Sequence, residues 1–425
     1  MLLKLYQIMT SLAAPLIGLY LLHRKKLGKE DPLRFRERLG KASVPRPNNK
    51  PLLWIHAASV GESLSVMPVI NKISQTYPNI TILLTTGTVS SAKMVESRLP
   101  DNAFHQYVPI DRILIIRRFL NYWRPNLAIW VESELWPNLV TETGKYCPMI
   151  LLNGRISDSS FKKWKRYYSL GKHILSRFSL SLAQSKHDAA RLEELGARNV
   201  KYIGNLKFDS AALPADPKKM GDMVAPIGER PVWLAASTHA GEEEMVAAVH
   251  KQLKEKHPDL LTIIAPRHPQ RSNEILDMLT DLGLSVSRRS FEQTIKDETD
   301  IYLADTLGEM GIFYRLVPTV FIGGSLVEHG GQNPLEAARL ECAIVFGPYM
   351  DNFAEIRNEL LNNNAALKVR NEDELRDAID ELIVDHDKHD QLASAALDLM
   401  DSKIGVLDKT MEELASHIEK IIPGS

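Results

Sequence analysis

The chain has 425 residues, of which 44% are hydrophobic and 25% are charged. At ~150 residues per domain, this length suggests two or three domains of an ordinary globular enzyme. A net charge of -1 argues against a polycationic nucleic-acid-binding protein. Its two cysteines are too few for a disulfide scaffold or a cysteine-rich zinc site, and they fit a reducing compartment.

The chain begins with an uncharged run from Leu5 to Leu22, interrupted by Pro15. Spanning a bilayer takes ~20 apolar residues, so this run lies at the lower limit for a membrane-spanning helix. A basic cluster follows the run, whereas a cleaved signal peptide carries its charge in front. We therefore predict a membrane-anchor helix over residues 1–24, with the remaining domains in the cytoplasm because basic flanks stay on that side. A buried amphipathic helix and a helix lying in the membrane interface are the alternatives.

The basic residues between Arg24 and Lys50 are expected to hold the protein against anionic lipid, since each cation near such a surface contributes about 1 kcal/mol. This segment predicts a membrane-tethered enzyme.

From Pro51 onward, short apolar β-branched runs alternate with helical patterns, which predicts parallel sheets. The expected strands cover residues 51–57, 80–86, 127–133, 149–153, 180–185 and 200–205, and then 232–237, 260–266, 300–305, 319–324 and 343–347. Residues 209–230 are rich in Pro, Gly and small side chains and are interpreted as a linker. We predict an α/β fold with two doubly wound Rossmann-like domains, at 25–208 and 231–425, facing across a cleft.

A glycine-rich segment stands out in the second half, FIGGSLVEHGGQNPLEAA at residues 321–338. Its apolar strand ends at Gly323, and a helix capped by Asn333 with Pro334 in the first position is predicted to follow. Free backbone N–H groups at the start of that helix would attract an anion, and glycine allows close approach of a phosphate. Glu336, at the capping-box position, is an alternative contact for the sugar hydroxyls of a nucleotide. The segment predicts a nucleotide-phosphate site, with an ordinary capped turn as the alternative.

Polar residues follow two other strands of the same half. Arg267 and His268 come after LLTIIAP with Arg271 a turn later, and Ser237-Thr238-His239 end the first strand. Ligands of doubly wound sheets bind beyond the carboxyl ends of the strands. Because a guanidinium binds phosphate through paired hydrogen bonds, Arg267 is a predicted phosphate ligand, and a solvated turn is the alternative.

The first half carries carboxylates at its strand ends. Glu62 follows a strand beside the flexible Gly61, where a general base is well placed, although a helix dipole alone would also favour an acid there. Glu132 and Glu134 end an apolar strand, and strand alternation predicts that they lie on the same side. Lys207, next to the predicted linker, is a candidate cation. Together these residues predict an acidic pole with a nearby cation, and each could instead be an ordinary surface charge.

Two other kinds of site are disfavoured. No GxxxxGK[ST] motif occurs, which argues against a P-loop NTPase. The run DHDKHD at 385–390 resembles metal ligands but lacks a preceding apolar strand, so it is interpreted as a solvated face. We predict neither a metal nor another cofactor. The patterns together indicate a transferase that moves a nucleotide-activated group onto a lipid-embedded acceptor.

The motifs resemble those of the 3-deoxy-D-manno-octulosonic acid (Kdo) transferases of lipopolysaccharide assembly, which are GT-B glycosyltransferases. The resemblance extends from the amino terminus to about residue 360. Its carriers are DPLRFRERLG (31–40), SVGES (59–63), ESELWPNL (132–139), NGRIS (153–157), GNLKFD (204–209), STHAGEE (237–243), PRHPQR (266–271), GGSLVEHGGQNPLEAA (323–338) and FGPYMDNF (346–353). Glu-Ser-Glu stands at 132–134 where Glu-Thr-Glu is common in the family.

The resemblance implies that Glu62 is the general base and that Glu132 and Lys207 assist the transition state. It also implies a set of contacts to the cytidine nucleotide: Pro266, Arg267, Leu307, Gly308, Glu309, Asn333, Pro334, Leu335 and Glu336. Among these, residues 307–309 are not indicated by composition or periodicity and come from the resemblance alone. The implied reaction is inverting, metal-independent transfer of Kdo from CMP-Kdo to the 6′-hydroxyl of a lipid A precursor, lipid IVA. The implied location is the cytoplasmic side of the inner membrane, with anionic lipid but no nucleic acid as a partner.

Two alternative functions remain open at this point. One is a different membrane-associated GT-B enzyme that uses a UDP-sugar, which shares the fold and the membrane preference. The other is a membrane-tethered nucleotide-binding adaptor without catalysis, for which the first-domain carboxylates would have no role.

Overall fold

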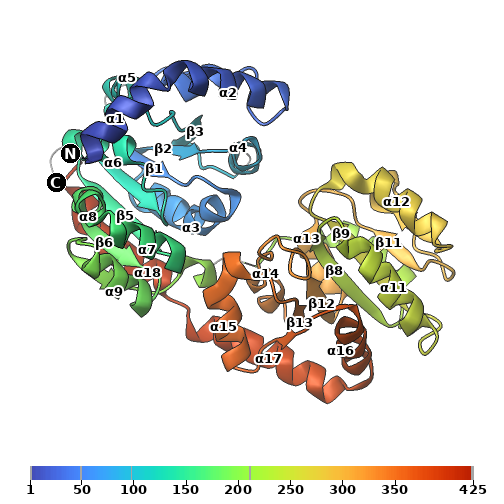
Figure 1. Cartoon of the computed structure of the whole chain (residues 1–425). Helices are drawn as coiled ribbons and strands as arrows, with labels where there is room; N and C mark the ends of the chain where they lie inside the picture. Colours follow the sequence, from blue (N-terminus) through green and yellow to red (C-terminus); the bar gives the residue numbers. More distant parts are fainter. Residues whose placement is uncertain (1, 48–49, 97, 210–211, 423–425) are drawn as a thin grey trace. The chain divides into compact units, whose positions relative to one another are not determined.

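The structure of the protein is a computed structural model that describes residues 2–47, 50–96, 98–209 and 212–422 (Figure 1). The chain divides into two compact units, Met1–Ser210 with Ile404–Ser425, and Ala211–Lys403. Each unit is built on its own parallel sheet.

The first unit contains a seven-stranded parallel sheet with the order β3-β2-β1-β4-β5-β6-β7. Its strands are β1 (Leu52–His56), β2 (Thr81–Thr86), β3 (Ala103–Tyr107), β4 (Leu127–Val131), β5 (Met149–Gly154), β6 (Phe178–Ala183) and β7 (Val200–Tyr202). Alternate residues of β1 enter two different cores: Leu53 packs toward α3 (Val60–Thr76), whereas Trp54 packs toward α5 (Ile113–Trp123). Because both faces of the sheet are buried, its strands are continuous apolar runs rather than alternating ones.

Apart from the two amino-terminal helices described below, the remaining helices of this unit cover the two faces of its sheet. They are α4 (Val89–Glu96), α6 (Pro137–Tyr146), α7 (Asp158–Arg166), α8 (Tyr168–Leu175), α9 (Lys186–Glu194) and α18 (Val406–Glu419), with the short turns η1 (Phe35–Leu39) and η2 (Leu206–Asp209). Figure 1 shows α18, the last helix of the chain, lying within the first unit. Its Leu414 and Ile418 are fully buried in the same core as Val66 of α3. The predicted domain of residues 231–425 therefore ends too late, because the apolar face of α18 completes the first core.

The second unit has the sheet order β10-β11-β9-β8-β12-β13-β14, again with parallel pairs. Its strands are β8 (Val232–Thr238), β9 (Leu261–Pro266), β10 (Val286–Arg288), β11 (Ile301–Leu303), β12 (Thr319–Ile322), β13 (Ala343–Phe346) and β14 (Leu367–Lys368). Its helices are α10 (Pro217–Ile227), α11 (Glu242–Lys254), α12 (Ser272–Asp281), α13 (Met310–Leu316), α14 (Leu335–Ala338), α15 (Ala354–Asn362), α16 (Glu372–Val384) and α17 (His386–Ser402). The turns are η3 (Pro269–Arg271), η4 (Arg289–Phe291) and η5 (Asp351–Phe353).

All eleven predicted strands are present with shifted ends, and three further strands were not predicted. β3 and β10 are edge strands that contain polar residues such as His105 and Ser287, and β14 has only two residues. The interpretation of 209–230 as a linker is wrong for its centre, where α10 begins after the N-cap Asp216 and the N-terminal Pro217. A cap followed by proline is a helix-start signal that the abundance of small residues obscured.

Residues 2–26 form two helices, α1 (Leu2–Leu12) and α2 (Ala14–Lys26), rather than the single predicted helix over 1–24. Their axes differ by 60°. Pro15 has no N–H to donate to the carbonyl of Ser11 and its ring crowds that carbonyl, which accounts for the bend. Among the described residues, no single helix is long and apolar enough to cross a bilayer. In the same part of the chain, only α1 and α2 taken together have the length and the apolar composition of a membrane-spanning segment.

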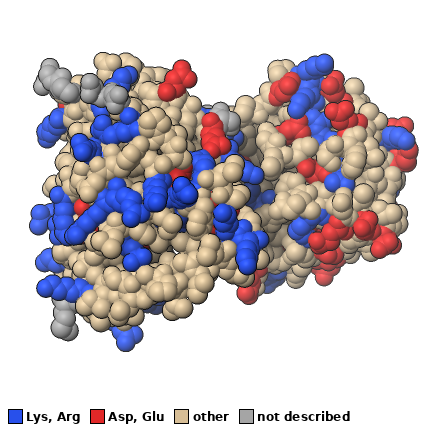
Figure 2. All heavy atoms as spheres, turned by 90° about the horizontal axis from the view of Figure 1, so that it is seen from above, with Lys and Arg blue, Asp and Glu red and all other residues tan. Residues whose placement is uncertain are grey.

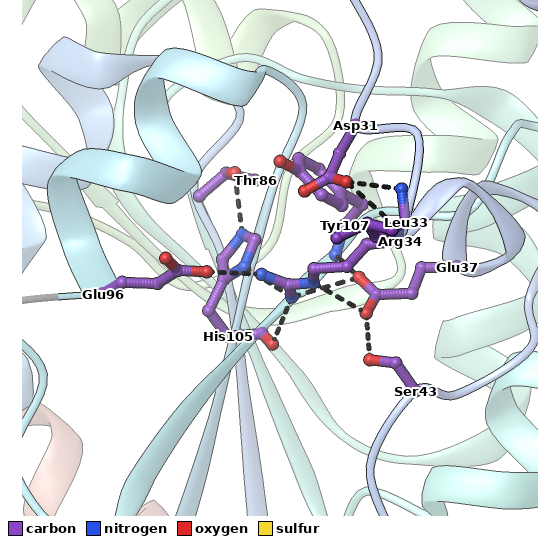
Figure 3. Close-up of polar contacts among 9 residues, drawn as sticks. All are labelled: Asp31, Leu33, Arg34, Glu37, Ser43, Thr86, Glu96, His105 and Tyr107. Carbon is purple, nitrogen blue, oxygen red and sulfur yellow. Dashed lines mark hydrogen bonds and ion pairs between the residues drawn. The ribbon is translucent and has the colours of Figure 1, made fainter. Parts of the chain in front are cut away.

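The basic segment after α2 is folded onto the edge of the first sheet (Figure 3). Arg34 donates to Glu37 at 3.0 and 3.2 Å, to Glu96 at 2.6 Å and to the carbonyl of His105 at 2.8 Å. The fully buried Glu37 also accepts the backbone N–H of Tyr107 at 2.7 Å. The expectation that the whole basic segment faces lipid is therefore wrong for Arg34, which pairs with a buried carboxylate.

Two further arginines of this segment pair internally as well. Glu30 is buried and lies 2.7 Å from Arg24 and 3.4 Å from Arg38. The cations of the segment that stay exposed are Lys26, Lys29, Arg36, Lys41 and Lys50. These five side chains, rather than the full basic run, are available to an anionic surface.

Candidate functional site

The predicted carboxylates of the first unit lie at the place where the order of its sheet reverses. From β1, the chain continues to β2 and β3 on one side of the sheet, whereas β4 and the later strands lie on the other side. The switch point of the sheet is therefore between β1 and β4. Ligands of doubly wound sheets bind beyond the carboxyl ends of the strands at such a point. Glu62 follows β1 and Glu132 follows β4 directly, which brings the two acids to one edge.

The carboxylate of Glu62 is held by the first turn of α3. Ser59 is the N-cap of this helix, and its Oγ accepts the backbone N–H of Glu62 at 3.2 Å. In return, Glu62 Oε1 accepts the Ser59 hydroxyl at 3.0 Å, and Oε2 accepts the backbone N–H of Ala58 at 2.8 Å. This reciprocal capping arrangement restricts the side chain to one orientation.

The protonation of Glu62 is tuned to neutral pH. The residue is only 8% exposed, and its burial, together with the negative charges of Glu132 and Glu134, raises the pKa of its carboxyl group. The hydrogen bonds from Ala58 and Ser59 oppose that rise, and the resulting pKa is about 7. A carboxyl group with a pKa near the working pH is suited to accept a proton from an attacking hydroxyl.

Glu132 forms a close ion pair with Lys207. Its backbone has a φ of +59°, uncommon for a residue with a Cβ, and its N–H donates to the carbonyl of Leu152 at 2.9 Å. Lys207, which lies in η2, places Nζ 2.7 Å from Oε1 of Glu132. The structure thus brings together all three residues expected to act in catalysis.

Two asparagines that sequence reasoning did not single out support Lys207. The Oδ1 of the buried Asn153 accepts the N–H of Leu206 at 3.1 Å, and Oδ1 of Asn205 accepts the N–H of Lys207 at 3.0 Å. Asn153 itself has a φ of +54°, a conformation that asparagine tolerates better than most residues. For Asn153, the available signal was an Asn-Gly pair at the end of a predicted strand.

Glu134 does not share the strand geometry assumed for it. β4 ends at Val131, because the left-handed backbone of Glu132 breaks the alternation. The Glu134 carboxylate accepts the indole N–H of Trp136 at 2.7 Å. Alternation therefore gives no reason to place Glu134 beside Glu132, although its charge still acts on Glu62.

The glycine-rich segment of the second unit follows β12, at the switch point between β8 and β12. In the first part of this segment, the backbone N–H groups of Gly324, Ser325 and Leu326 donate to the buried carboxylate of Glu242 at 2.6 to 3.0 Å, so they are not available to a ligand. The N–H of His239 donates to the same carboxylate at 2.9 Å. Glu242 therefore occupies the anion position at the start of this loop and joins it to the loop after β8.

The helix cap in this segment lies one residue later than expected. α14 begins at Leu335 with Pro334 as its N-cap. Asn333 Oδ1 accepts the N–H of Leu335 at 3.2 Å, and Asn333 Nδ2 lies 3.4 Å from the Glu336 carboxylate. Since Asn333 still caps the turn, the difference concerns only the boundary, the least certain part of a helix prediction.

Residues 307–309 follow β11, which is the neighbour of β9. The Glu309 carboxylate accepts hydrogen bonds from Arg289 at 3.0 and 2.9 Å, from Lys219 at 2.9 Å and from Thr306 at 2.5 Å. The bonds from Arg289 are the main reason that its pKa falls to about 2. Leu307 is 79% exposed, so this loop offers an apolar side chain and a carboxylate that is already paired.

Residues at the end of β9 adjoin the loop after β8. The backbone N–H of Arg267 donates to the carbonyl of Thr238 at 2.9 Å, and Pro266 is buried at the strand end. Arg271 pairs with the buried Glu243 at 3.0 Å, so its positive charge is partly neutralised by a residue of the same unit.

The chain is similar to known transferases over most of its length. A family model described as 3-deoxy-D-manno-octulosonic-acid transferase matches residues 33–210. The 3-deoxy-D-manno-octulosonic acid transferase of Rickettsia bellii is 37% identical over 89% of this chain and 90% of its own. That of Haemophilus influenzae is 32% identical over 91% of this chain and 93% of its own.

The chain is also similar to solved structures. A UDP complex of Staphylococcus aureus MnaA has a TM-score of 0.60 at 12% identity, over 88% of this chain and 98% of that one. The C-terminal CMP-Kdo binding domain of WaaA from Acinetobacter baumannii is 32% identical, covers 43% of this chain and 96% of its own, and has a TM-score of 0.42. At 12% identity, the first likeness concerns the two-sheet architecture alone.

Proposed function

This chain belongs to the family of 3-deoxy-D-manno-octulosonic acid (Kdo) transferases, and we propose that it transfers Kdo from CMP-Kdo to the 6′-hydroxyl of a lipid A precursor. The observation that carries this proposal is the group Glu62, Glu132 and Lys207 at the switch point of the first sheet. A buried acid with a raised pKa beside a second acid and a cation is typical of a catalytic site.

In the proposed mechanism, Glu62 accepts the proton of the acceptor hydroxyl while that oxygen attacks the anomeric carbon of Kdo. The bond between this carbon and the CMP phosphate breaks in the same step, which inverts the configuration. The capping bonds from Ser59 and Ala58 keep the carboxylate aimed at one point, so little reorganisation is needed. Lys207, held by Glu132, supplies positive charge for the transition state.

The second unit is proposed to hold the donor. Arg267 follows β9, the strand beside β8, and Asn333–Glu336 follow the glycine-rich loop. Cationic side chains can balance the charge of a leaving CMP without a divalent ion. Because the Glu309 carboxylate is already paired with Arg289 and Lys219, we assign the nucleotide contact of this loop to the backbone and to Leu307.

The amino-terminal helices are proposed to attach the enzyme to the inner membrane. Their exposed apolar side chains include Leu5, Ile8, Met9, Leu12, Leu16, Leu19 and Leu22. Figure 2 looks down on the side where α1 and α2 lie in Figure 1, and it shows Lys and Arg gathered on that face of the first unit. An apolar surface flanked by basic side chains suits a helix pair lying in the interface of an anionic membrane. Such a position would give the enzyme access to a lipid-embedded acceptor.

The proposed reaction is tested by mass spectrometry of a tetraacylated lipid A precursor incubated with the enzyme and freshly generated CMP-Kdo, with EDTA present. We expect a mass gain of one or more Kdo units. A gain that requires added magnesium would contradict metal-independent transfer. If neither condition gives a product and UDP raises the melting temperature while CMP does not, the enzyme uses a UDP-sugar instead.

Two variants assign the roles of the two units. Glu62→Ala is expected to abolish transfer while CMP still binds, because the base lies outside the nucleotide site. Arg267→Ala is expected to weaken CMP binding by about tenfold to a hundredfold, the loss of one charge-assisted contact. Near-normal turnover in Glu62→Ala would contradict the base assignment, and it would also be the result expected of a non-catalytic adaptor.

A further inference from the structure

Three histidines of the second unit come from three different loops and meet at the carboxyl edge of its sheet. His239 follows β8, His268 follows β9 and His329 follows β12, and these strands are adjacent in the order β9-β8-β12. The His239 ring stacks on His329 with centroids 4.2 Å apart, and it meets His268 edge-on at 5.6 Å. Gln332 Nε2 lies 3.1 Å from Nε2 of His239 and fixes this ring.

The surroundings of these rings are strongly positive. His239 is 9% exposed, and its pKa is lowered to about 4. Burial is the largest cause, and the neighbouring positive charges lower the pKa further; these belong to His329, His268, Arg267 and Arg271. The pKa of His268, whose side chain is exposed but partly shielded from water, is lowered by this partial desolvation and by the same two arginines.

The carboxylates on α11 that could offset this charge are directed elsewhere. Glu242 accepts backbone N–H groups of the glycine-rich loop and of His239 itself. Glu243 accepts the hydroxyl of Thr238 and pairs with Arg271, both at 3.0 Å. The His239 ring therefore faces the arginines that follow β9 and the His329 imidazole that follows β12. The carboxylates of α11 connect the loops to one another instead of neutralising this charge.

Such an arrangement selects an anion rather than a metal. Two imidazoles stacked 4.2 Å apart repel each other once both are protonated, and a neighbouring anion removes that penalty. Among the described residues, no group of three or more His, Cys, Asp or Glu is arranged to hold a metal ion.

We propose that His239, His268 and His329, together with Arg267, form a subsite for a negatively charged group of the donor, and that filling it draws a proton from solvent onto the imidazoles. The group is either the phosphate or the sugar carboxylate, which share this anionic chemistry. A neutral imidazole gains one proton from the buffer when the anion binds and returns it when the anion leaves. This inference rests on the proposed function, since it takes CMP-Kdo as the donor.

The test is isothermal titration calorimetry of the full-length enzyme with CMP and with cytidine between pH 6.5 and pH 8, in two buffers of different ionisation enthalpy. The wild type is expected to take up protons on binding CMP, and its affinity should rise as the pH falls. His239→Asn, His268→Asn and His329→Asn should bind CMP about tenfold to a hundredfold more weakly, with cytidine binding unchanged. Each should also take up fewer protons than the wild type. The exposed His268 and His329 provide variants with little risk to folding.

His386→Asn is the matched control, because His386 is an exposed histidine at the start of α17 in the same unit. The second pKa of CMP itself is about 6, so proton uptake is compared near pH 8, where the free nucleotide is already a dianion and exchanges few protons. If CMP binding is unchanged but the KM for CMP-Kdo rises in the variants, the subsite binds the sugar carboxylate. If CMP affinity, proton uptake and that KM all match the wild type, the inference is wrong. Failure of the wild type to bind CMP would instead refute the proposed donor.

Discussion

At the scale of single residues, the reactivity of Glu62 is set by opposing neighbours. Burial and the charge of Glu132 raise its pKa, while two hydrogen bonds at the start of α3 lower it. The result lies near 7, so the group is about half ionised at neutral pH. Transfer should therefore rise with pH through this value, because only the ionised carboxylate accepts a proton.

Replacing Glu132 with glutamine is expected to shift the acid limb of the kcat/KM profile to lower pH, since it removes the negative charge that raises the pKa of Glu62 the most. The rate itself should also fall, because Lys207 loses its partner. The profile of the residual activity between pH 5 and pH 9 measures the shift.

Glu134→Gln is the matched control, because its charge acts on Glu62 more weakly than that of Glu132. It should displace the limb less. No displacement in either variant would show that the acid limb belongs to a group other than Glu62, and an equal displacement would contradict the stronger effect of Glu132.

At the scale of loops and helices, carboxylates join segments that lie far apart in the sequence. Glu242 joins the loop after β8 to the glycine-rich loop, and Asp209 accepts the backbone N–H groups of Gly405 and Leu407 at the start of α18. Sequence reasoning identified the glycines but not Glu242. A carboxylate in the first turn of a helix has an ordinary explanation in the helix dipole.

Glu242→Gln should destabilise the second unit, because an amide offers one acceptor oxygen where the carboxylate offers two. The cost is about 1–3 kcal/mol for each buried N–H left without an acceptor. CMP affinity should fall as well, since the loop loses its anchor. Thermal unfolding and CMP titration measure the two effects. Glu244→Gln, an exposed position on the same helix, should change neither. A wild-type melting temperature in Glu242→Gln would contradict the anchoring role.

At the scale of the whole molecule, the end of the chain returns to the first unit. Leu414 and Ile418 are fully buried in the core that also contains Val66 of α3 and Leu206 beside Lys207. The position of Lys207 thus depends on residues more than 200 positions further along the chain. This dependence arises because the apolar face of α18 covers an otherwise exposed part of the core.

Leu414→Ala should lower the free energy of unfolding by about 2–5 kcal/mol, the usual cost of removing a buried leucine side chain. Urea unfolding of the full chain measures this loss. Glu412→Ala, on the exposed side of α18, should leave stability nearly unchanged. Equal stability of the two variants would mean that α18 does not pack on the first core.

Membrane attachment is expected to depend on both the apolar and the basic side chains of the amino-terminal region. Leu16→Asp and Leu19→Asp should reduce sedimentation with anionic phospholipid vesicles, because both side chains are exposed. Lys26→Gln with Lys29→Gln should weaken binding by about 1 kcal/mol per cation, more at low salt than at high salt. Val384→Asp, an exposed apolar position in the second unit, is the control. Binding unchanged by the leucine variants would contradict attachment through α1 and α2.

The local sequence is sufficient to predict the two parallel α/β sheets and the polar residues at their strand ends. Continuous apolar runs and turn residues are short-range signals, so Glu62, Glu132, Lys207 and Arg267 could be found without coordinates. The bend at Pro15 is local as well, since it follows from the proline ring itself. The edge strand β3 and the return of α18 instead depend on which surfaces each segment can bury. The pairing of Glu132 with Lys207 and the capture of loop N–H groups by Glu242 were likewise decided by tertiary structure. Charges and hydrogen-bond donors act over a few ångströms in space, whatever their separation along the chain.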